Sequence, residues 1–566
     1  MEFETTRTFD VLVVGGGIAG TTAALHAARS GARTAIACAG ALFSGSSFYP
    51  GTWGLGLVGP ESSDDEDDLV RAILEVGCGA ALPKLVSVFV RDIPSAIDEL
   101  EAAGVRLMRP DRPDEREFVP CFDRKHRLWR GIVRESYEEA VRRELERLGV
   151  EILPGRTLVD LVERDGAVAG AVLAARGKAA FEPVDSKATV LATGGFGGLF
   201  ERRLTANDVT GSAHAVALAH GCALVNLEFM QMMPGLVSPK RGIVFNEKTF
   251  RHVALRNPDG TDPFAGRSDA QALLEERSGH GPFTARLASR AIDLAMDAAG
   301  PKGLAVRYRI GDAEDGAESA ALPEFVRTYF DWLEEAAGIQ PTDELRIAPY
   351  AHAANGGILI DADGSCGVPG LFACGEATGG MHGADRIGGL SSANGLVFGR
   401  RAGRSAAAWS KERAEVRRSG DALSADVPRH ALPNAPEIAR LLRRTMTESC
   451  MIVRTEDGLE RALATIDELA ERARAEVRPA SDATAIAEAA IVRNQLMLAK
   501  AFAEAAIVRT ESRGAHFRAD FPAEDPAQAR PLLVELDAQG APRTRPLAPD
   551  ARNAPAGLEP ASGARR

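Results

Sequence analysis

A strand, a glycine-rich turn, a helix and a second strand follow one another within residues 9–36, FDVLVVGGGIAGTTAALHAARSGARTAI. The apolar run at 11–14 predicts a buried strand, and the Ala-rich stretch beyond the turn has helical periodicity. Gly15, Gly17 and Gly20 have the spacing of the dinucleotide-binding fingerprint, in the strand–turn–helix setting that this fingerprint requires. The rest of the chain must therefore be arranged around a nucleotide-binding βαβ unit.

Each glycine of this turn has a physical task. Gly15 permits the tight turn, Gly17 lets the backbone approach a pyrophosphate, and Gly20 lets the helix pack against the strand. The helix N-terminus presents unpaired N–H groups and a partial positive charge to phosphates. An acidic residue usually follows the second strand and binds ribose hydroxyls, but residues 37–39 are Ala-Cys-Ala. The unit therefore favours FAD, held by further motifs, over NAD.

Length and composition set wider bounds. A chain of 566 residues is too long for one hydrophobic core, so about two to four domains are expected. The net charge of −12 disfavours nucleic acid as a partner. No stretch approaches the roughly 20 apolar residues that a membrane span needs. The seven cysteines lack metal-ligand spacing, which argues against an iron–sulfur or zinc site and for a reducing compartment. With no basic segment of a secretion signal at the N-terminus, the cytoplasm is expected.

Periodicity outlines the remaining elements. Helices are expected near 67–76, 82–103 and 130–148, and a hairpin over 150–175 that turns at Asp165-Gly166. The apolar run at 532–536 predicts a strand in an otherwise Pro- and Arg-rich tail. Changes in composition suggest five parts: 1–235 and 346–425 as two parts of an FAD-binding domain, 236–345 as an inserted capping domain, 426–525 as a helical domain, and 526–566 as a partly disordered tail.

A second group of glycines follows another apolar strand. The strand that begins near 187 leads into Ala-Thr193-Gly194-Gly195, which marks the return of the chain to the cofactor in flavoproteins with two dinucleotide-binding domains. A third strand at 371–374 leads to Gly375-Glu376 and a Gly-rich loop, and a helix is expected from Ser391.

Seven motifs then occur in the order seen in one known family, and they cover nearly the whole chain. The sequence resembles the flavoprotein subunits of succinate dehydrogenase and fumarate reductase, with L-aspartate oxidase as their sibling. The motifs are GGGIAG near the N-terminus, ATGG at 192–195, LEFMQ at 227–231, HAANGGI at 352–358, GLFACGE at 370–376, HGADRIGGLS at 382–391 and ESRGAHFRADFP at 511–522.

The resemblance implies a fold and a chemistry. The fold is α/β: a Rossmann-like FAD-binding domain of the two-dinucleotide-binding-domain type, an inserted α+β capping domain and a C-terminal helical domain. The chemistry is hydride exchange between flavin N5 and a small carboxylate. Gly15, Gly17 and Gly20 would hold the pyrophosphate, and Thr193, Gly194 and Gly195 would return to the cofactor. Glu376 would bind ribityl or ribose hydroxyls, and Ser391 would face the flavin O2 edge. His352 and Arg386 match the family's substrate histidine and carboxylate-clamping arginine.

Three departures from the family are visible. The histidine that links flavin covalently should fall near Ser46, and its absence predicts non-covalent FAD. The family's QFHPT is replaced by Gln-Met-Met-Pro-Gly at 231–235, and the RGEGG loop is missing. These losses predict that succinate and fumarate are poor substrates and that one end of the substrate is apolar, unless Lys240 or Arg241 supplies a second cation.

The third departure concerns the proton-donating arginine. In PFTARLASRAI (282–292) Arg286 is the nearest candidate, but it lies one residue out of register. Two alternatives to a carboxylate reductase or dehydrogenase stay open: amino-acid oxidation of the L-aspartate oxidase type, and a non-catalytic electron-transfer subunit. The resemblance also implies a separate electron-transfer protein, iron–sulfur or flavin, as a partner.

Overall fold

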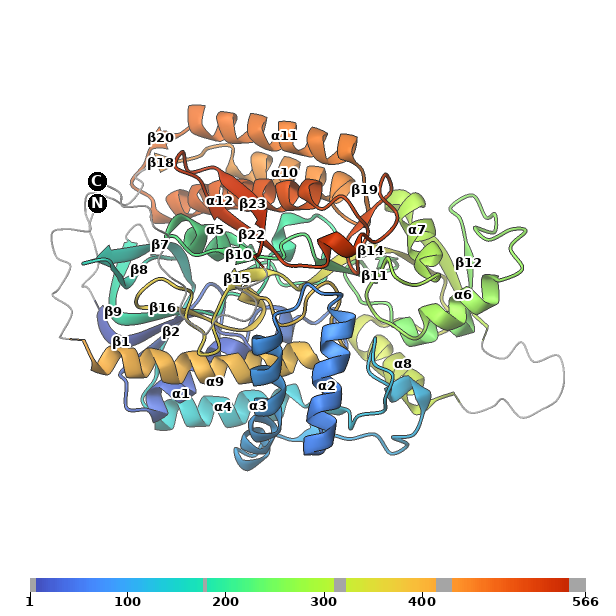
Figure 1. Cartoon of the computed structure of the whole chain (residues 1–566), viewed down its shortest axis with the longest axis horizontal. Helices are drawn as coiled ribbons and strands as arrows, with labels where there is room; N and C mark the ends of the chain where they lie inside the picture. The colour runs from blue at the N-terminus through green and yellow to red at the C-terminus, as the bar shows by residue number, and fades with distance from the viewer. Residues whose placement is uncertain (1–6, 177–180, 310–321, 414–429, 549–566) are drawn as a thin grey trace.

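The computed structural model describes residues 7–176, 181–309, 322–413 and 430–548. A seven-stranded sheet at one end of the molecule carries the opening unit (Figure 1). Its strands run in the order β6-β2-β1-β9-β8-β7, and β16 also pairs with β9. The bounds are β1 Arg7–Val14, β2 Thr34–Cys38, β6 Glu151–Pro154, β7 Arg156–Arg164, β8 Ala167–Ala175, β9 Phe181–Leu191 and β16 Leu371–Ala373.

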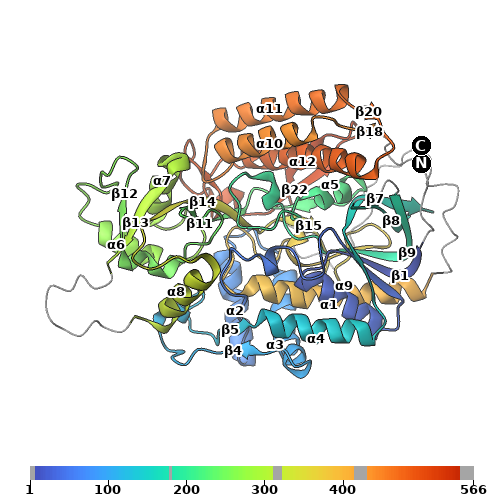
Figure 2. The same ribbon diagram turned by 180° about the vertical axis from the view of Figure 1, so that it is seen from behind.

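The opening βαβ unit has the predicted form. β1 lies parallel to β2, and α1 (Ile18–Arg29) connects them. Gly15 has φ +121°, and a Cβ atom on Gly20 would lie 1.9 Å from the Gly15 carbonyl oxygen, so both positions require glycine. α9 (Leu390–Lys411) runs beside α1 in both views (Figures 1 and 2). The two helices touch backbone to backbone at Gly403, where a Cβ atom would lie 2.2 Å from the Ala23 oxygen.

The hairpin and the first helices agree with the sequence except at three boundaries, one of which is the start of α2 at Ser63, four residues before the expected 67. β7 and β8 are antiparallel, and Asp165 and Gly166 both have positive φ at the turn. Residues 151–154 do not belong to the hairpin, because they form β6 and pair in parallel with β2. The helix expected from 130 begins later, because residues 130–132 form a strand. The elements are α2 Ser63–Val76, α3 Pro83–Ala102, β3 Gly56–Leu57, β4 Leu107–Met108, β5 Arg130–Ile132 and α4 Arg134–Arg147.

A four-stranded antiparallel sheet lies at the end of the molecule opposite the seven-stranded sheet (Figures 1 and 2). Its order is β11-β14-β13-β12, and α6 to α8 lie in the same part of the fold with their own cluster of buried apolar side chains. β11 begins before residue 236 and β14 ends after residue 345, so the sheet includes residues on both sides of the 236–345 segment in the sequence. The bounds are β11 Met230–Ser238, β12 Val253–Arg256, α6 Ala270–Arg277, α7 Arg290–Ala298, β13 Leu304–Tyr308, α8 Glu324–Ala337 and β14 Leu345–Ala354.

The C-terminal part is helical and ends on a small sheet. α10 (Ala435–Ser449), α11 (Glu456–Ala475) and α12 (Ala483–Val508) form it. The strand predicted at 532–536 is confirmed as β22, which pairs with β23 (Pro542–Pro546) and β10 (Leu224–Val225). The end of the tail, from 549, lies outside the described residues. None of the helices within the described residues is long and apolar enough to cross a membrane.

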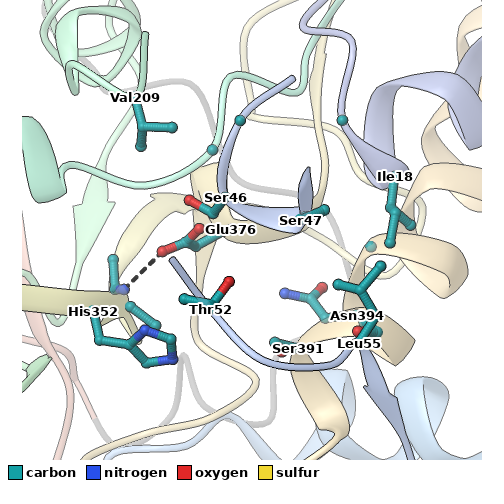
Figure 3. A pocket seen from close by; sticks show the side chains of 18 of the residues that line it. Ile18, Ser46, Ser47, Thr52, Leu55, Val209, His352, Glu376, Ser391 and Asn394 are labelled. Carbon is teal, nitrogen blue, oxygen red and sulfur yellow. Dashed lines mark hydrogen bonds between the residues drawn. The ribbon is translucent and has the colours of Figure 1, made fainter. Parts of the chain in front are cut away.

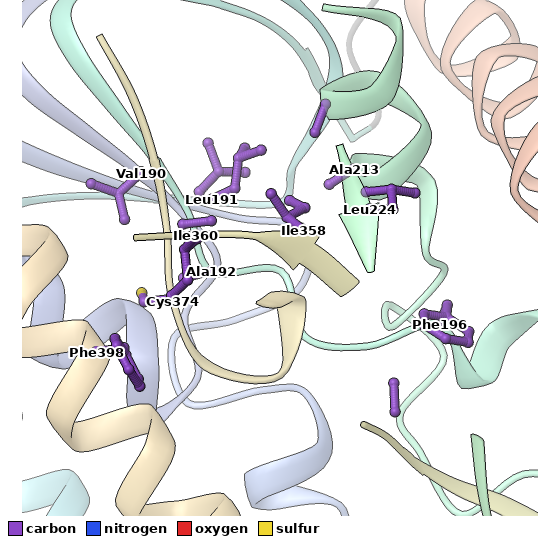
Figure 4. Packing of buried hydrophobic residues seen from close by; sticks show 14 of the residues in the cluster. Val190, Leu191, Ala192, Phe196, Ala213, Leu224, Ile358, Ile360, Cys374 and Phe398 are labelled. Carbon is purple, nitrogen blue, oxygen red and sulfur yellow. The ribbon is translucent and has the colours of Figure 1, made fainter. Parts of the chain in front are cut away.

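Buried apolar side chains fix the loops that return to the cofactor motifs. The end of β9, with Val190, Leu191 and Ala192, packs close to Ile358 and Cys374 (Figure 4). Val190 and Leu191 are fully buried, and burial of one such side chain is worth about 1.5–3 kcal/mol. The backbone at 193–195 and at 375–376 therefore starts from rigid strand ends.

His220 ties the turn after α5 (Ser212–Ala219) to the β7 hairpin and makes stability depend on pH. Its ring contacts Glu163 and lies 2.8 Å from Asp160. Burial opposes the charged ring, but the two carboxylates outweigh it and raise the pKa of His220 to about 9. The ion pairs of His220 therefore stabilise the folded protein fully below about pH 6.5, the pKa of histidine in the unfolded chain. This stabilisation is lost as the pH rises through about 9. We expect His220→Gln to destabilise the protein by about 1 kcal/mol at pH 6, since both carboxylates are half exposed. Melting curves of both proteins at pH 6 and pH 10 would refute this if the difference were equal at the two values.

Candidate active site

A cavity of about 400 Å³ lies where the carboxyl ends of the parallel strands meet the start of α9 and the four-stranded sheet. Most residues predicted to bind cofactor or substrate line it. Figure 3 shows Glu376 and His352 on one side of this cavity, and Ser391 and Asn394 on the other. The predicted residues that line it are Gly15, Gly17, Ser46, Thr193, Gly194, His352, Glu376, Arg386 and Ser391.

The glycine-rich side of the cavity has the features of a cofactor cradle. A Cβ atom on Gly17 would meet nothing closer than 3.7 Å, so the start of α1 is open to a ligand. Thr193 Oγ1 and Asn394 Oδ1 are buried and have no hydrogen-bond partner among the residues that the structure describes. Unpaired buried polar atoms are costly, so these two atoms fit a polar cofactor such as FAD.

Glu376 is held at the centre of this wall. Its Oε1 accepts a hydrogen bond of 3.0 Å from the Ala354 amide, and burial raises the pKa of its carboxyl group. Gly195 does not line the cavity, but a Cβ atom there would lie 2.6 Å from Glu376 Oε1. Gly195 and Gly20 therefore serve close packing behind the cavity wall.

Asp208 was not identified from the sequence. It lines the cavity, its Oδ1 is buried without a partner among the described residues, and its Oδ2 would lie 3.3 Å from a Cβ atom on Gly40. Gly40 follows β2, where the dinucleotide fingerprint usually has its acidic residue. The Asp208 carboxylate thus lies beside the chain that follows β2, and no local pattern in the sequence indicates this position.

Arg386 and His352 lie close to each other in the lining of the cavity. Arg386 is 9% exposed, and its Nε donates a 3.1 Å hydrogen bond to Gln231 Oε1. Burial lowers its pKa, and the Glu376 charge opposes this change. Burial and the Arg386 charge lower the pKa of His352 to about 3, so its ring is neutral at pH 7. The pair can offer one positive charge and a neutral hydrogen-bonding ring.

Lys248 is a second cation in the cavity, and the sequence did not point to it. It is 4% exposed, lines the cavity, and donates through Nζ to the Val119 oxygen at 3.1 Å. An ammonium has three donors, so two remain for a ligand. Glu247 also lines the cavity, and its Oε1 accepts a 3.0 Å hydrogen bond from Cys121 Sγ. Lys240 and Arg241 do not line it: Lys240 Nζ donates to the Ala336 oxygen, and Arg241 lines a different cavity.

Arg286 does not line the cavity either. Its Nε lies 2.9 Å from Asp385 Oδ2, and its guanidinium lies over the Phe122 ring at 5.5 Å. Asp385 also accepts a hydrogen bond from Thr284 and is fully buried. This carboxylate holds Arg286 away from the position that the sequence suggested, and within segment 282–292 only Pro282 reaches the cavity.

Four aromatic side chains form a continuous wall of the cavity. Trp53 meets Phe325 edge to face at 4.6 Å, Phe325 meets Phe118 at 5.3 Å, and Phe118 meets Trp129 at 5.9 Å between ring centroids. All four rings line the cavity. They give it a large apolar surface in addition to Met233 and Val244.

The comparisons with known proteins agree with this geometry. Residues 10–392 match the FAD binding domain family, and residues 439–536 match the fumarate reductase flavoprotein C-terminal family. The chain is 30% identical to one of the subunits of fumarate reductase (CoM/CoB) from Methanothermobacter marburgensis, across 93% of this chain and 96% of the relative. It is also 30% identical to L-aspartate oxidase of Caulobacter vibrioides, with the same coverage.

Solved structures show the same architecture. Sdh1 of Mycobacterium smegmatis, solved in complex with UQ1, superposes with a TM-score of 0.78 at 25% identity, covering 96% of this chain and 94% of that one. The predicted α/β class is confirmed, with its FAD-binding part and C-terminal part. The chain belongs to the FAD-dependent oxidoreductase family that includes fumarate reductase flavoprotein subunits and L-aspartate oxidases.

Proposed function

We propose that this FAD-dependent oxidoreductase acts on the carbon–carbon bond next to the carboxylate of a small acid with an apolar end. The observation that carries the proposal is the position of Arg386, a buried arginine that faces a cavity next to a polar cradle and an aromatic wall. Bound FAD would supply hydride transfer at N5. Arg386 would hold the carboxylate through charge-assisted hydrogen bonds, and the aromatic wall would hold the other end.

The remaining residues would orient the reactants and move a proton. Neutral His352 would hydrogen-bond the substrate without adding charge. Lys248, with two donors left beside its bond to the Val119 oxygen, would supply the proton, since Arg286 does not line the cavity. Gly15 and Gly17 would accept the pyrophosphate beside α1, Glu376 and Asp208 would bind sugar hydroxyls, and the α9 N-terminus at Ser391 would stabilise negative charge on the reduced flavin.

Reductase assays with reduced viologen would test this proposal. The purified, FAD-loaded protein should oxidise the viologen in the presence of at least one 2-enoic acid from a panel that varies in the size of its apolar end. An intact flavin spectrum with no turnover on the whole panel would instead support the non-catalytic electron-transfer subunit.

Amino-acid oxidation is the second candidate, and Glu247 is the observation that favours it. An amino-acid substrate carries an ammonium group. Glu247 is a carboxylate that lines the cavity, and among the described residues it accepts a side-chain hydrogen bond only from the Cys121 thiol. Hydrogen peroxide formed from L-aspartate and oxygen would identify this activity. Glu247→Gln should then abolish it, while the reduction of enoic acids would not require the carboxylate.

FAD should bind without a covalent link. Ser46 lines the cradle where a linking histidine would be needed, and the sequence from 27 to 125 contains no histidine. Precipitation of the protein with acid should release the yellow chromophore into the supernatant. Flavin that stays with the denatured pellet would contradict the prediction.

Electrons would come from a separate iron–sulfur or flavin protein. No group of His, Cys, Asp and Glu suited to a metal ion occurs within the described residues. The seven cysteines are free, which supports a reducing compartment such as the cytoplasm.

A further inference from the structure

A second cavity, of about 480 Å³, lies behind the wall of the first. Segment 46–53 separates the two: Ser46, Thr52 and Trp53 line the first cavity, whereas Tyr49 and Pro50 line the second. β14 contributes in the same way, with Tyr350 in the second cavity and His352 in the first. None of the activity proposed above uses this second cavity.

Three arginines line the second cavity, namely Arg202, Arg203 and Arg241. Within the described part of the chain, none of them forms a salt bridge with a carboxylate. Arg202 donates to the Pro349 oxygen at 3.1 Å, and Arg203 donates to the Phe200 oxygen and to Asn207 Oδ1 at 3.1 and 2.7 Å. By contrast, Arg127, Arg277 and Arg513, which are also buried, contact carboxylates.

Other groups near the cavity leave positive charge in excess. Burial lowers the pKa of Arg202 and Arg203, and the nearby Arg443 lowers that of Arg203 further. The carboxylates that act on Arg202 are Asp297 and Glu201. The lining itself holds three arginines and one carboxylate, that of Glu201, so two positive charges are in excess. Half-buried guanidinium groups in excess of their counter-ions are costly unless an anion joins them.

Polar atoms and rings complete the lining. Within the parts of the chain that the structure describes, Arg203 Nε and Thr205 Oγ1 are buried without a hydrogen-bond partner, and Thr205 is 3% exposed. The hydroxyl groups of Tyr49 and Tyr350 donate to the Gly242 and Leu236 oxygens, at 3.0 and 2.8 Å, so they are not available to compete for a ligand. The arginine donors are therefore the groups that remain for recognition.

We propose that this second cavity binds a small dianion, either a phosphate monoester or a dicarboxylate. Two negative charges match the excess of two arginines, and guanidinium forks bind both kinds of oxyanion in a bidentate manner. The Ala351 amide donates to the Arg202 oxygen, and the Leu204 amide donates to the Ala351 oxygen, at 2.9 and 2.8 Å. The arginine segment is thus hydrogen-bonded to Ala351, which directly precedes His352 in β14.

Titration calorimetry on the FAD-loaded full chain, at constant ionic strength, would test the site. The probes are glycerol 3-phosphate, succinate and the monoanion acetate. We expect saturable binding of at least one dianion in the millimolar range, and binding of acetate at least about tenfold weaker. The dianion that binds more tightly identifies the phosphate or the carboxylate source.

Variants separate the second cavity from the first. Arg203→Gln and the exposed Arg241→Gln should each weaken dianion binding at least about fivefold, which is the loss of part of one charge-assisted contact. Arg545→Gln, in the exposed C-terminal hairpin, should leave it unchanged. The flavin spectrum and the melting temperature show whether each variant is folded.

Three results would overturn the proposal: no saturable heat from either dianion, equal affinity for acetate, or unchanged affinity in both Arg203→Gln and Arg241→Gln. In the first case the arginines would be better explained as a contact for an acidic protein surface. Dianion binding does not depend on turnover, so this result is independent of the enoate assay.

Discussion

Arg386→Lys is expected to lower kcat/KM by about 100-fold or more, while FAD stays bound. Arg386 lines the cavity, and its Nε donates a hydrogen bond to Gln231. Its two other guanidinium nitrogens can therefore hold a carboxylate in one plane. Lysine keeps the charge, but it loses the fork that orients the substrate. Steady-state kinetics on the best enoic acid, with flavin content measured by absorbance, would give the effect.

Arg286→Lys is the matched control. Arg286 pairs with Asp385 outside the cavity, and lysine preserves that charge pair. Its kcat should stay within a few-fold of the wild-type value, because no step at the substrate uses it. A collapse of turnover in Arg286→Lys with normal kinetics in Arg386→Lys would reverse the two assignments.

Fumarate should be a poorer substrate, by at least about tenfold in kcat/KM, than a mono-carboxylate enoic acid with an aromatic end. The aromatic wall of Trp53, Phe118, Trp129 and Phe325 offers no positive charge for a second carboxylate. Glu247, which also lines the cavity, would repel it. Competition between the two substrates under reduced viologen measures the ratio directly.

Lys248→Met shows whether the second cation changes this preference. If Lys248 donates the proton, both substrates should lose turnover to a similar degree. If Lys248 binds a second carboxylate, fumarate should lose far more than the enoic acid. Fumarate preferred by the wild-type protein, together with that selective loss, would restore the ordinary fumarate reductase assignment.

Most of the fold could be predicted from local patterns in the sequence. The βαβ unit, the turn at Asp165-Gly166 and β22 could be predicted because each depends on neighbouring residues: glycines at a turn or apolar alternation. The predicted start of α4, at residue 130, was wrong because Arg130 and Gly131 form part of β5 and pair with β3 and β4. Pairing between strands that are far apart in the sequence cannot be read from neighbouring residues.

The site shows the same division. Arg386, Glu376 and His352 fall in short motifs, and all three line the cavity. Asp208 and Lys248 come from segments without a recognisable pattern and reach the cavity only through tertiary packing. Arg286 pairs with Asp385 outside the cavity lining, and no local pattern in the sequence indicates this pairing.

The close contact of α1 with α9 has a consequence for biosynthesis. Gly403 meets Ala23 backbone to backbone, and the cradle is complete only when Glu376 and Ser391 have joined Gly15 and Gly17. On the ribosome, the first half of the cradle emerges long before its partner does. Contacts between residues so far apart in sequence form slowly. We therefore expect the glycine turn to stay uncovered until the second half has been translated, and FAD to bind late in folding.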